Sequence, residues 1–263
     1  MSEYEFLLID EPAPHVRRIT MNRPEKRNAI STPMRSEIFT ALQRHDSDPD
    51  VRVTILRGAG VCFSSGYDLG GGALMDDAPI YSAPGDGQWA RQATDGWFGI
   101  WDLAKPVIAQ IHGYAMAGAT ELASACDLVY MADDATIGYP VVRVMSPPDW
   151  QYHTPLVGLR AAMEMMLTGN TYGAEQCVQV GFANRAYPAE QLDEQVLGIA
   201  NDVARVASDL QQINKRSVHR SFDVWGARAA MRAGQEFQAL AGHQASVQDA
   251  KQDPLAAMKR AFD

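Results

Sequence analysis

The sequence contains few of the residues that mark disulfide-rich or metal-binding proteins. Its 263 residues include three cysteines, Cys62, Cys126 and Cys177, which lie far apart and form no CxxC pair. This spacing argues against a disulfide framework and against a cysteine-based zinc site. The six histidines show no HExxH spacing, so we expect no metal ion and no resident cofactor.

Long apolar runs and a signal peptide are also lacking. No apolar segment approaches the roughly 18 residues that a membrane-spanning helix needs. The N-terminal segment MSEYEFLLIDEP is acidic, whereas a secretory signal places basic residues before its apolar stretch. We therefore expect a cytoplasmic protein that does not bind membranes.

Positive charge is scarce, with a formal net charge of −9. Nucleic-acid binding depends on the neutralisation of phosphates by Lys and Arg, so nucleic acid is not expected as a partner. The chain also has neither the GxSxG turn of α/β-hydrolases nor a phosphate-binding P-loop. An anionic small molecule held by a few local cations stays compatible with this composition.

What is present is an α/β pattern. Strands are predicted over residues 4–10, 15–22, 51–60 and 105–113, with two more in 127–140, and helices over 31–48 and 158–169. Ser31 or Thr32 would cap the first helix, and Gly169 would end the other. The order strand, strand, helix favours an α/β core of stacked turns over a Rossmann sheet.

The pattern divides the chain at about residue 190. We assign residues 1–190 to the α/β core and residues 191–263 to a C-terminal region, where amphipathic helical spacing dominates. The Gly-, Pro- and Asp-rich segment from Leu69 to Gln88 is predicted to be a loop, which could serve as a lid.

One carboxylate, Glu121, lies inside the apolar stretch GYAMAGATELASACDLV, residues 113–129. Burial among apolar neighbours would raise its pKa and suit it to general acid–base catalysis. The alternative is that Glu121 only interacts with the unpaired N–H groups of the first helical turn. The sequence pattern leaves both interpretations open.

Two small-residue turns, CFSSGYDL and GYAMAGATEL, follow predicted strands. Such turns expose backbone N–H groups, and two of them converging on one point form an oxyanion hole. We predict that this pair consists of the N–H groups of Tyr67 and Gly118. Small residues would let a substrate carbonyl approach the backbone closely.

Several of these segments together carry a family resemblance. NRPEKRNAIS, CFSSGYDL, KPVIAQIHGYAMAGATELASACDL and AMEMMLTGNTYGAEQCVQVGFANRAY, in this order, resemble the enoyl-CoA hydratase/isomerase (crotonase) family. The resemblance covers most of the first 190 residues and continues weakly to DPLAAMKRAF at the end.

The resemblance implies a crotonase-like spiral of strand–strand–helix units, C-terminal helices that build a homotrimer or a dimer of trimers, and an acyl-CoA thioester as substrate. Coenzyme A would then enter as part of the substrate. It makes Glu121 the first catalytic glutamate and the Tyr67 and Gly118 N–H groups the oxyanion hole. The implied substrate-binding residues are Lys26, Arg27, Ala29, Ser65, Gly66, Tyr67, Asp68, Leu69, Gly118 and Lys259. Solvation alone would equally explain the three cations.

The sequence departs from the family where hydratases carry a second glutamate in a GxPE stretch. Here the stretch is IGYPVV, with Val141 in that place, and MSPPDWQYHTPL replaces the usual glycine-rich segment. Asp149 is our first candidate for a replacement catalytic group and His153 the second. Alternatively, the segment is a rigid surface or substrate-shaping loop, with Trp150 and Tyr152 packing on the acyl chain.

Three functions therefore stay open. The leading prediction is an enoyl-CoA hydratase that stabilises a thioester enolate. Its rival is a one-base relative, either a double-bond isomerase or a hydrolase or lyase of a β-oxo or hydroxyacyl-CoA. The third is a catalytically weak acyl-CoA-binding protein, which Val141 favours and Glu121 disfavours.

Overall fold

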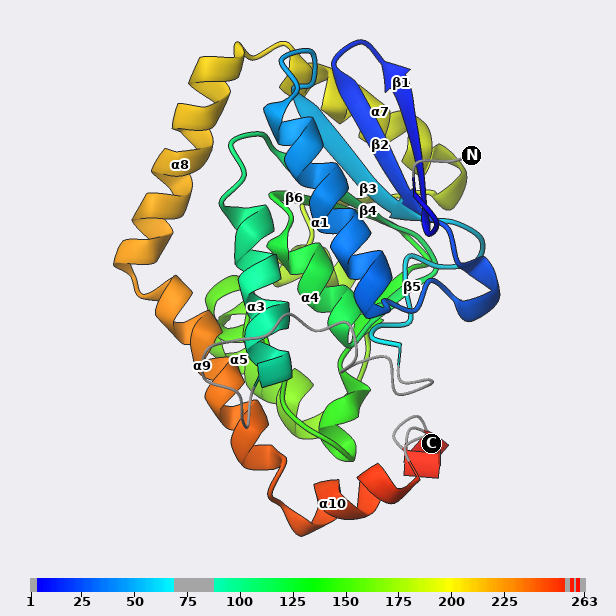
Figure 1. Cartoon of the computed structure of the whole chain (residues 1–263), viewed down its shortest axis with the longest axis vertical. Coiled ribbons are helices and arrows are strands. Elements are labelled where there is room, and N and C mark those ends of the chain that lie inside the picture. Colours follow the sequence, from blue (N-terminus) through cyan, green and yellow to red (C-terminus); the bar gives the residue numbers. More distant parts are fainter. Residues whose placement is uncertain (1–3, 69–87, 254–255, 258, 261–263) are drawn as a thin grey trace.

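The computed structural model describes residues 4–68, 88–253, 256–257 and 259–260. Two sheets form the core (Figure 1). The larger has the order β1-β2-β3-β4-β6-β9 and the smaller the order β5-β7-β8. The strands are β1 (Leu7–Ala13), β2 (Val16–Met21), β3 (Val53–Gly58), β4 (Val107–Ile111), β5 (Tyr114–Met116), β6 (Leu128–Ala132), β7 (Thr136–Gly138), β8 (Tyr172–Gly173) and β9 (Arg185–Tyr187).

Successive turns of the chain contribute to both sheets. β4 lies in the larger sheet and β5 in the smaller, and helix α4 (Gly118–Ala125) follows; β6 and β7 repeat the alternation. From β2 to β9 every pairing in the larger sheet is parallel. This arrangement confirms the predicted spiral of strand–strand–helix units.

The remaining helices surround these sheets. They are η1 (Pro24–Lys26), α1 (Thr32–Ser47), α3 (Gln88–Trp101), η2 (Pro140–Arg143), α5 (His153–Thr168), α6 (Ala174–Gln179), η3 (Ala189–Gln191), α7 (Leu192–Ala204), α8 (Ser208–Val224), α9 (Ala227–Ala241) and α10 (Ala245–Gln252). No helix in the described part of the chain is both long and apolar enough to cross a membrane.

Helices α1 and α7 cover opposite faces of the larger sheet (Figure 1). His45 of α1 hydrogen-bonds Thr54 at 3.1 Å, whereas Asp193 of α7 accepts two hydrogen bonds from Arg57, each 2.8 Å. Thr54 and Arg57 are three positions apart on β3, and side chains alternate between faces along a strand. A sheet covered on both faces explains why all five residues of β4 are buried.

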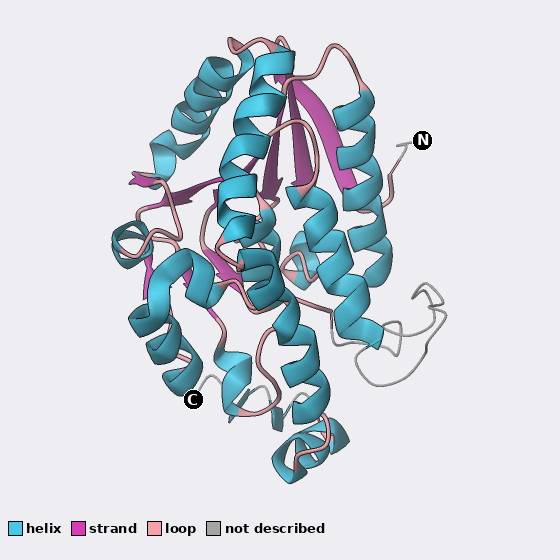
Figure 2. Ribbon diagram, turned by 90° about the vertical axis from the view of Figure 1, so that its left-hand side faces the viewer, coloured by secondary structure: helices cyan, strands magenta, loops and turns pink. Residues whose placement is uncertain are grey.

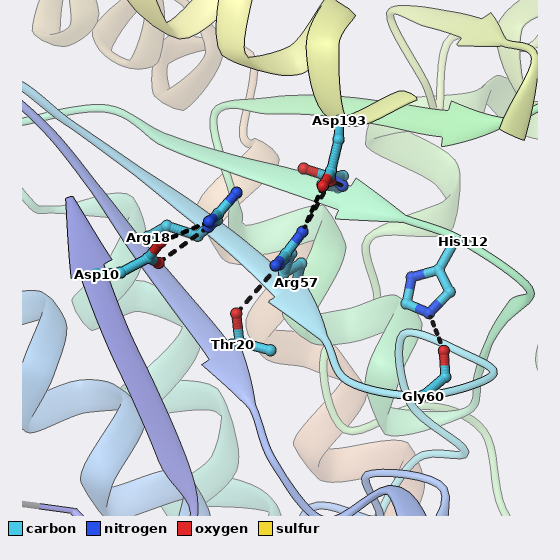
Figure 3. Close-up of polar contacts among 8 residues, drawn as sticks. Asp10, Arg18, Thr20, Arg57, Gly60, His112 and Asp193 are labelled. Atoms are coloured by element: carbon cyan, nitrogen blue, oxygen red, sulfur yellow. Dashed lines mark hydrogen bonds and ion pairs between the residues drawn. The ribbon is translucent and has the colours of Figure 1, made fainter. Parts of the chain in front are cut away.

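Charged side chains fix α7 to its face of the sheet. Figure 3 shows Arg57 between Asp193 and Thr20, whose hydroxyl accepts from the Arg57 Nε at 3.1 Å. Next to it, Arg18 of β2 donates to Asp10 of β1 at 2.9 Å. These residues line a cavity of about 750 Å³. The cavity is therefore bordered by cations that already have carboxylate partners.

The C-terminal helices pack along one side of the core, and Figure 2, viewed from that side, shows helices in front of the strands. Lys215 of α8 donates to Asp127 at 2.9 Å, with the two side chains 7% and 12% exposed. Gly234 of α9 packs against the backbone of Pro148 and Asp149, where a Cβ on residue 234 would lie 2.7 Å from both carbonyl oxygens. Helix α9 thus supports the segment that replaces the glycine-rich stretch.

Local predictions can be compared with these elements. Ser31 caps α1, because its hydroxyl accepts the Met34 N–H at 3.3 Å, and α5 ends at Gly169, whose φ is +66°. Helix α3 was not predicted. The apolar stretch from Gly113 first forms the short strand β5, and helix α4 begins only at Gly118. Residues 69–87 of the predicted loop lie outside the described residues, and its last residue, Gln88, is instead the first residue of α3.

Candidate active site

Glu121 is fully buried in the first turn of α4, and three aromatic side chains hold its carboxylate. Oε2 accepts from the Tyr67 hydroxyl at 2.7 Å and from the Trp97 indole N–H at 3.1 Å. Oε1 accepts from the Tyr139 hydroxyl at 3.0 Å. We call Tyr67, Trp97 and Tyr139 the aromatic cage. The carboxylate therefore binds side chains of distant segments.

The members of the cage come from three separate parts of the chain. Tyr67 lies in the turn after β3, Trp97 on α3, and Tyr139 directly after β7. Trp97 and Tyr139 are 0% and 5% exposed, whereas Tyr67 is half-buried. Packing of α3 against α4 is what brings the indole to Glu121.

Burial raises the pKa of Glu121, and hydrogen bonds from the cage oppose part of that rise because they favour the ionised form. A backbone hydrogen bond from Asp149 acts in the same direction as the cage. Burial, and next the charge of Glu121, raise the pKa of Tyr67 and Tyr139 well above 10. Both phenols thus stay protonated at neutral pH, beside a carboxylate that is more basic than an ordinary glutamate.

The two small-residue turns contact each other. Ser64 and Ala115 form a parallel bridge, in which the Met116 N–H donates to the Ser64 carbonyl at 3.1 Å. Gly66 has a φ of +98°, and a Cβ there would lie 2.6 Å from the Met116 carbonyl oxygen and 3.3 Å from the Gly118 nitrogen. Only glycine allows this approach.

Position 118 also requires glycine, because of the Tyr67 ring. A Cβ at Gly118 would lie 2.6 Å from a ring carbon of Tyr67, so the Tyr67 ring rests directly on the start of α4. Ala117, just before it, has a φ of +49°, which is strained for a residue with a side chain. The backbone N–H groups of Tyr67 and Gly118 therefore belong to adjacent, tightly constrained turns.

A buried asparagine holds the first turn in place. Asn28 donates to the carbonyls of Ala59 and Cys62 at 2.8 and 2.9 Å. The Asn28 carbonyl accepts from the Ser64 hydroxyl at 2.7 Å, and that hydroxyl accepts the Gly66 N–H at 3.1 Å. The NRPEKRNAIS segment thus supports the turn that carries Tyr67.

Comparison with known proteins identifies one family. The sequence model of a family described as enoyl-CoA hydratase/isomerase matches residues 12–259. The chain belongs to this family. A probable enoyl-CoA hydratase of Rhizobium meliloti is 30% identical over 240 residues, 90% of each chain. One from Mycobacterium leprae is 30% identical over 224 residues, 84% of each.

Solved structures of the enoyl-CoA hydratase/isomerase family share the fold. An enoyl-CoA hydratase/isomerase of Xanthobacter autotrophicus Py2 matches with a TM-score of 0.86 and 31% identity, covering 98% of this chain and 97% of that one. A monofunctional enoyl-CoA isomerase of Mycobacterium smegmatis matches with a TM-score of 0.67 and 25% identity, covering 83% and 94%. Proteins named for both reactions thus resemble this chain.

For a member of this family, the place of the second glutamate is of particular interest. Val141 lies half-buried in η2, two residues beyond Tyr139 of the cage. Asp149 is 4% exposed, and its carbonyl accepts from the Thr94 hydroxyl at 3.0 Å. Its negative charge contributes to the raised pKa of both tyrosines. The segment thus folds inward, as our first candidate requires, and a catalytic role of Asp149 stays a prediction.

His153 lies at the start of α5 and is 1% exposed. Its Nδ1 is 2.8 Å from the Gln151 Oε1, and its ring stacks on Tyr152 at 4.0 Å. Burial lowers the pKa of His153 to about 3, so it is neutral and weakly basic at neutral pH. Trp150 and Tyr152 are 0% and 1% exposed. The segment is therefore not a surface loop, because these rings belong to the core, and packing of Trp150 and Tyr152 on an acyl chain stays a prediction.

The implied coenzyme A residues lie around the first turn. Lys26 and Arg27 are exposed, and the Arg27 carbonyl accepts the Ser65 N–H at 3.0 Å, which joins the two implied segments. The neighbouring Ala29 carbonyl accepts from Arg23, which also pairs with Asp68 at 3.0 Å. Lys259 is exposed near the C-terminus, and Leu69 lies outside the described residues.

Sequence reasoning missed the side chains of the cage. Tyr139 stands in the same IGYPVV stretch as Val141 and could have been considered there. The apolar residues Ala93, Trp97 and Ile100 have helical spacing, which would have predicted α3. Neither signal indicates that these side chains meet at Glu121.

Proposed function

We propose that this chain converts an enoyl-CoA thioester through a thioester enolate, with Glu121 as its acid–base group. The single observation that carries the proposal is a fully buried carboxylate one helical turn from Gly118, beside two interlocked turns. In the proposed complex the thioester carbonyl oxygen accepts from the Tyr67 and Gly118 N–H groups. Each such donor contributes about 10²–10³-fold to the rate.

Hydration of the conjugated double bond is the first candidate reaction, supported by the names of the relatives. Double-bond isomerisation is the second, and Val141 favours it. Hydration activates water at the β-carbon and delivers a proton to the α-carbon, work that two glutamates usually share in this family. A proton shift between two carbons of one substrate needs one acid–base group, which a site with Glu121 alone provides.

The assay uses trans-2-enoyl-CoA and trans-3-enoyl-CoA thioesters of short and medium length. Hydration removes the absorbance of the conjugated thioester, whereas isomerisation of the trans-3 compound creates it. We expect Glu121→Gln, which keeps the size of the side chain, to lower kcat by about 10²–10⁴-fold. Binding of a saturated acyl-CoA to both forms serves as the control, and tight binding without turnover by the wild type would leave only a binding role.

A homotrimer or dimer of trimers is part of the proposal. Large apolar side chains on the C-terminal helices support it, because they are too exposed for a helix face that meets only water. They are Leu210, Ile213, Val218, Val224, Trp225, Phe237 and Leu240, all between 54% and 81% exposed. Sedimentation velocity at several concentrations would test it.

A further inference from the structure

Glu121 is enclosed so completely that a substrate has no direct access to it. Its residue is 0% exposed, and donors from the cage occupy both carboxylate oxygens. Of the residues that donate these bonds, Trp97 and Tyr139 are buried and Tyr67 is half-buried. Tyr67 therefore has the most exposed surface in the cage, and its ring is the part that a bound acyl group meets first; its hydroxyl lies deeper, where it also accepts the Trp97 N–H at 3.3 Å.

We propose that the Tyr67 hydroxyl is the group that exchanges protons with the acyl chain, and that Glu121 acts through it. This inference rests on the proposed function, since it assigns the contact with the substrate at the same site. Tyr67 then has two catalytic roles: its backbone N–H binds the thioester oxygen, and its hydroxyl transfers the proton.

The geometry of Tyr67 joins these two parts. Its ring rests on Gly118, the other N–H donor, and its hydroxyl lies 2.7 Å from Glu121 Oε2. One end of the ring thus lies at the proposed site of the thioester oxygen, and the other end, with the hydroxyl, lies at the buried carboxylate of Glu121. The carbon next to the thioester carbonyl would lie along this ring, closer to the hydroxyl than to the enclosed Glu121.

The proton balance needs no further reactant for isomerisation. When a substrate C–H bond breaks, its electron pair enters the enolate and its proton joins the Tyr67 oxygen, while the Tyr67 proton moves to Glu121. The enolate then takes a proton at the other carbon from Tyr67, and Glu121 returns its proton to the phenol oxygen. In hydration, the same relay takes the proton released as water adds to the β-carbon and delivers one to the α-carbon.

The raised pKa values fit this direction of transfer. A phenol with so strongly raised a pKa does not persist as a phenolate, so its proton moves to Glu121 only as the substrate proton replaces it. Glu121, with its raised pKa, accepts that proton more readily than an exposed glutamate. The pair resembles other relays in which a base activates the group that touches the substrate.

The test compares Tyr67→Phe with Tyr139→Phe. Each removes one hydroxyl that donates to Glu121 and thereby raises the pKa of Glu121. Phenylalanine at position 67 keeps the ring on Gly118 and the backbone N–H. We measure kcat, KM and their pH profiles with the enoyl-CoA thioesters, and the exchange of α-protons of a saturated acyl-CoA in deuterated water.

If Tyr67 carries the proton, Tyr67→Phe lowers kcat and the exchange rate by about 10²–10⁴-fold, with little change in KM, and no pH restores them. Tyr139→Phe shifts the pH profile upward and recovers its rate at higher pH. Tyr67→Leu, a second variant without the hydroxyl, must show the same loss. Binding of the saturated thioester shows that each variant is folded.

Three outcomes overturn the proposal. Tyr67→Phe could keep the wild-type rate, or it could recover at higher pH as Tyr139→Phe does, and Glu121 would then meet the substrate directly. These two results leave the proposed function standing, because the wild type turns over its thioester. A wild type that neither converts enoyl-CoA nor exchanges α-protons overturns the proposed function and the relay together.

Discussion

The burial of His153 makes a quantitative prediction about stability in acid. Its pKa in the folded protein is about 3, because burial disfavours the charged imidazolium, whereas an unfolded chain titrates near 6.5. The unfolded state therefore binds more protons between pH 6.5 and pH 3. The stabilising contribution is complete above pH 6.5 and is lost as the pH falls through this range.

Linkage gives the size of the effect. Each pH unit in this window is worth about 1.4 kcal/mol, so lowering the pH from 7 to 4.5 removes about 2.5 kcal/mol through His153 alone. His153→Phe keeps a ring to stack on Tyr152 and cannot bind a proton. We expect it to be less stable at pH 7 by about 1 kcal/mol, because the contact with Gln151 is lost.

The measurement is the free energy of unfolding in urea, at pH 7 and pH 4.5 and at equal protein concentrations, for the wild type and the variant. Carboxylates titrate in both proteins, so the difference between their losses isolates His153. His45→Phe is the comparison, since burial lowers the pKa of His45 to about 4 but this side chain is only half-buried. A His153→Phe protein that loses stability in acid as steeply as the wild type would refute the reasoning.

Other substitutions probe the turns and the ion pairs. Gly66→Ala forces a Cβ against the backbone of Met116, and we expect kcat/KM to fall by at least about 10²-fold. The control is Gly198→Ala, where a Cβ meets nothing within 4 Å, and it should leave kcat/KM unchanged. Lys215→Met removes the cation beside the mostly buried Asp127 carboxylate, which keeps the Val107 N–H, and should cost about 3 kcal/mol in urea unfolding. Arg57→Ala removes an ion pair whose partner, Asp193, is largely exposed, so it should cost about 1 kcal/mol or less of unfolding free energy, and less still at high salt. Equal costs for Lys215→Met and Arg57→Ala would contradict the argument that burial decides the strength of these ion pairs.

Local signals predicted much of the core. The apolar residues of β3 and β4, the cap at Ser31 and the glycine at position 169 each act over a few residues, so the sequence pattern contains them. The order of strands and helices then predicted the stacked turns. Helix α3 was missed because it follows directly on a Gly- and Pro-rich segment, whose composition predicts a loop.

The site was predictable only in part. Glu121 stands out in the sequence because a carboxylate is unusual in an apolar helix. Its partners do not stand out, since Tyr67 and Trp97 are 54 and 24 positions away and meet it only through packing. The inward fold of Asp149 depends likewise on α9, whose Gly234 permits the close approach. Side-chain contacts of this range follow from the tertiary structure, and local patterns do not encode them.

The bridges that join Ser64 to Ala115 and Ile30 to Tyr67 have a consequence for how such a protein can evolve. Strand-like pairing of the backbone fixes where the Tyr67 N–H lies, whatever side chain that residue carries. The same position can therefore exchange its side chain, and with it the chemistry that we propose for this residue, without moving the N–H. The backbone donor and the side chain of this one residue can therefore change independently, and this chain combines a fixed backbone N–H with a tyrosine.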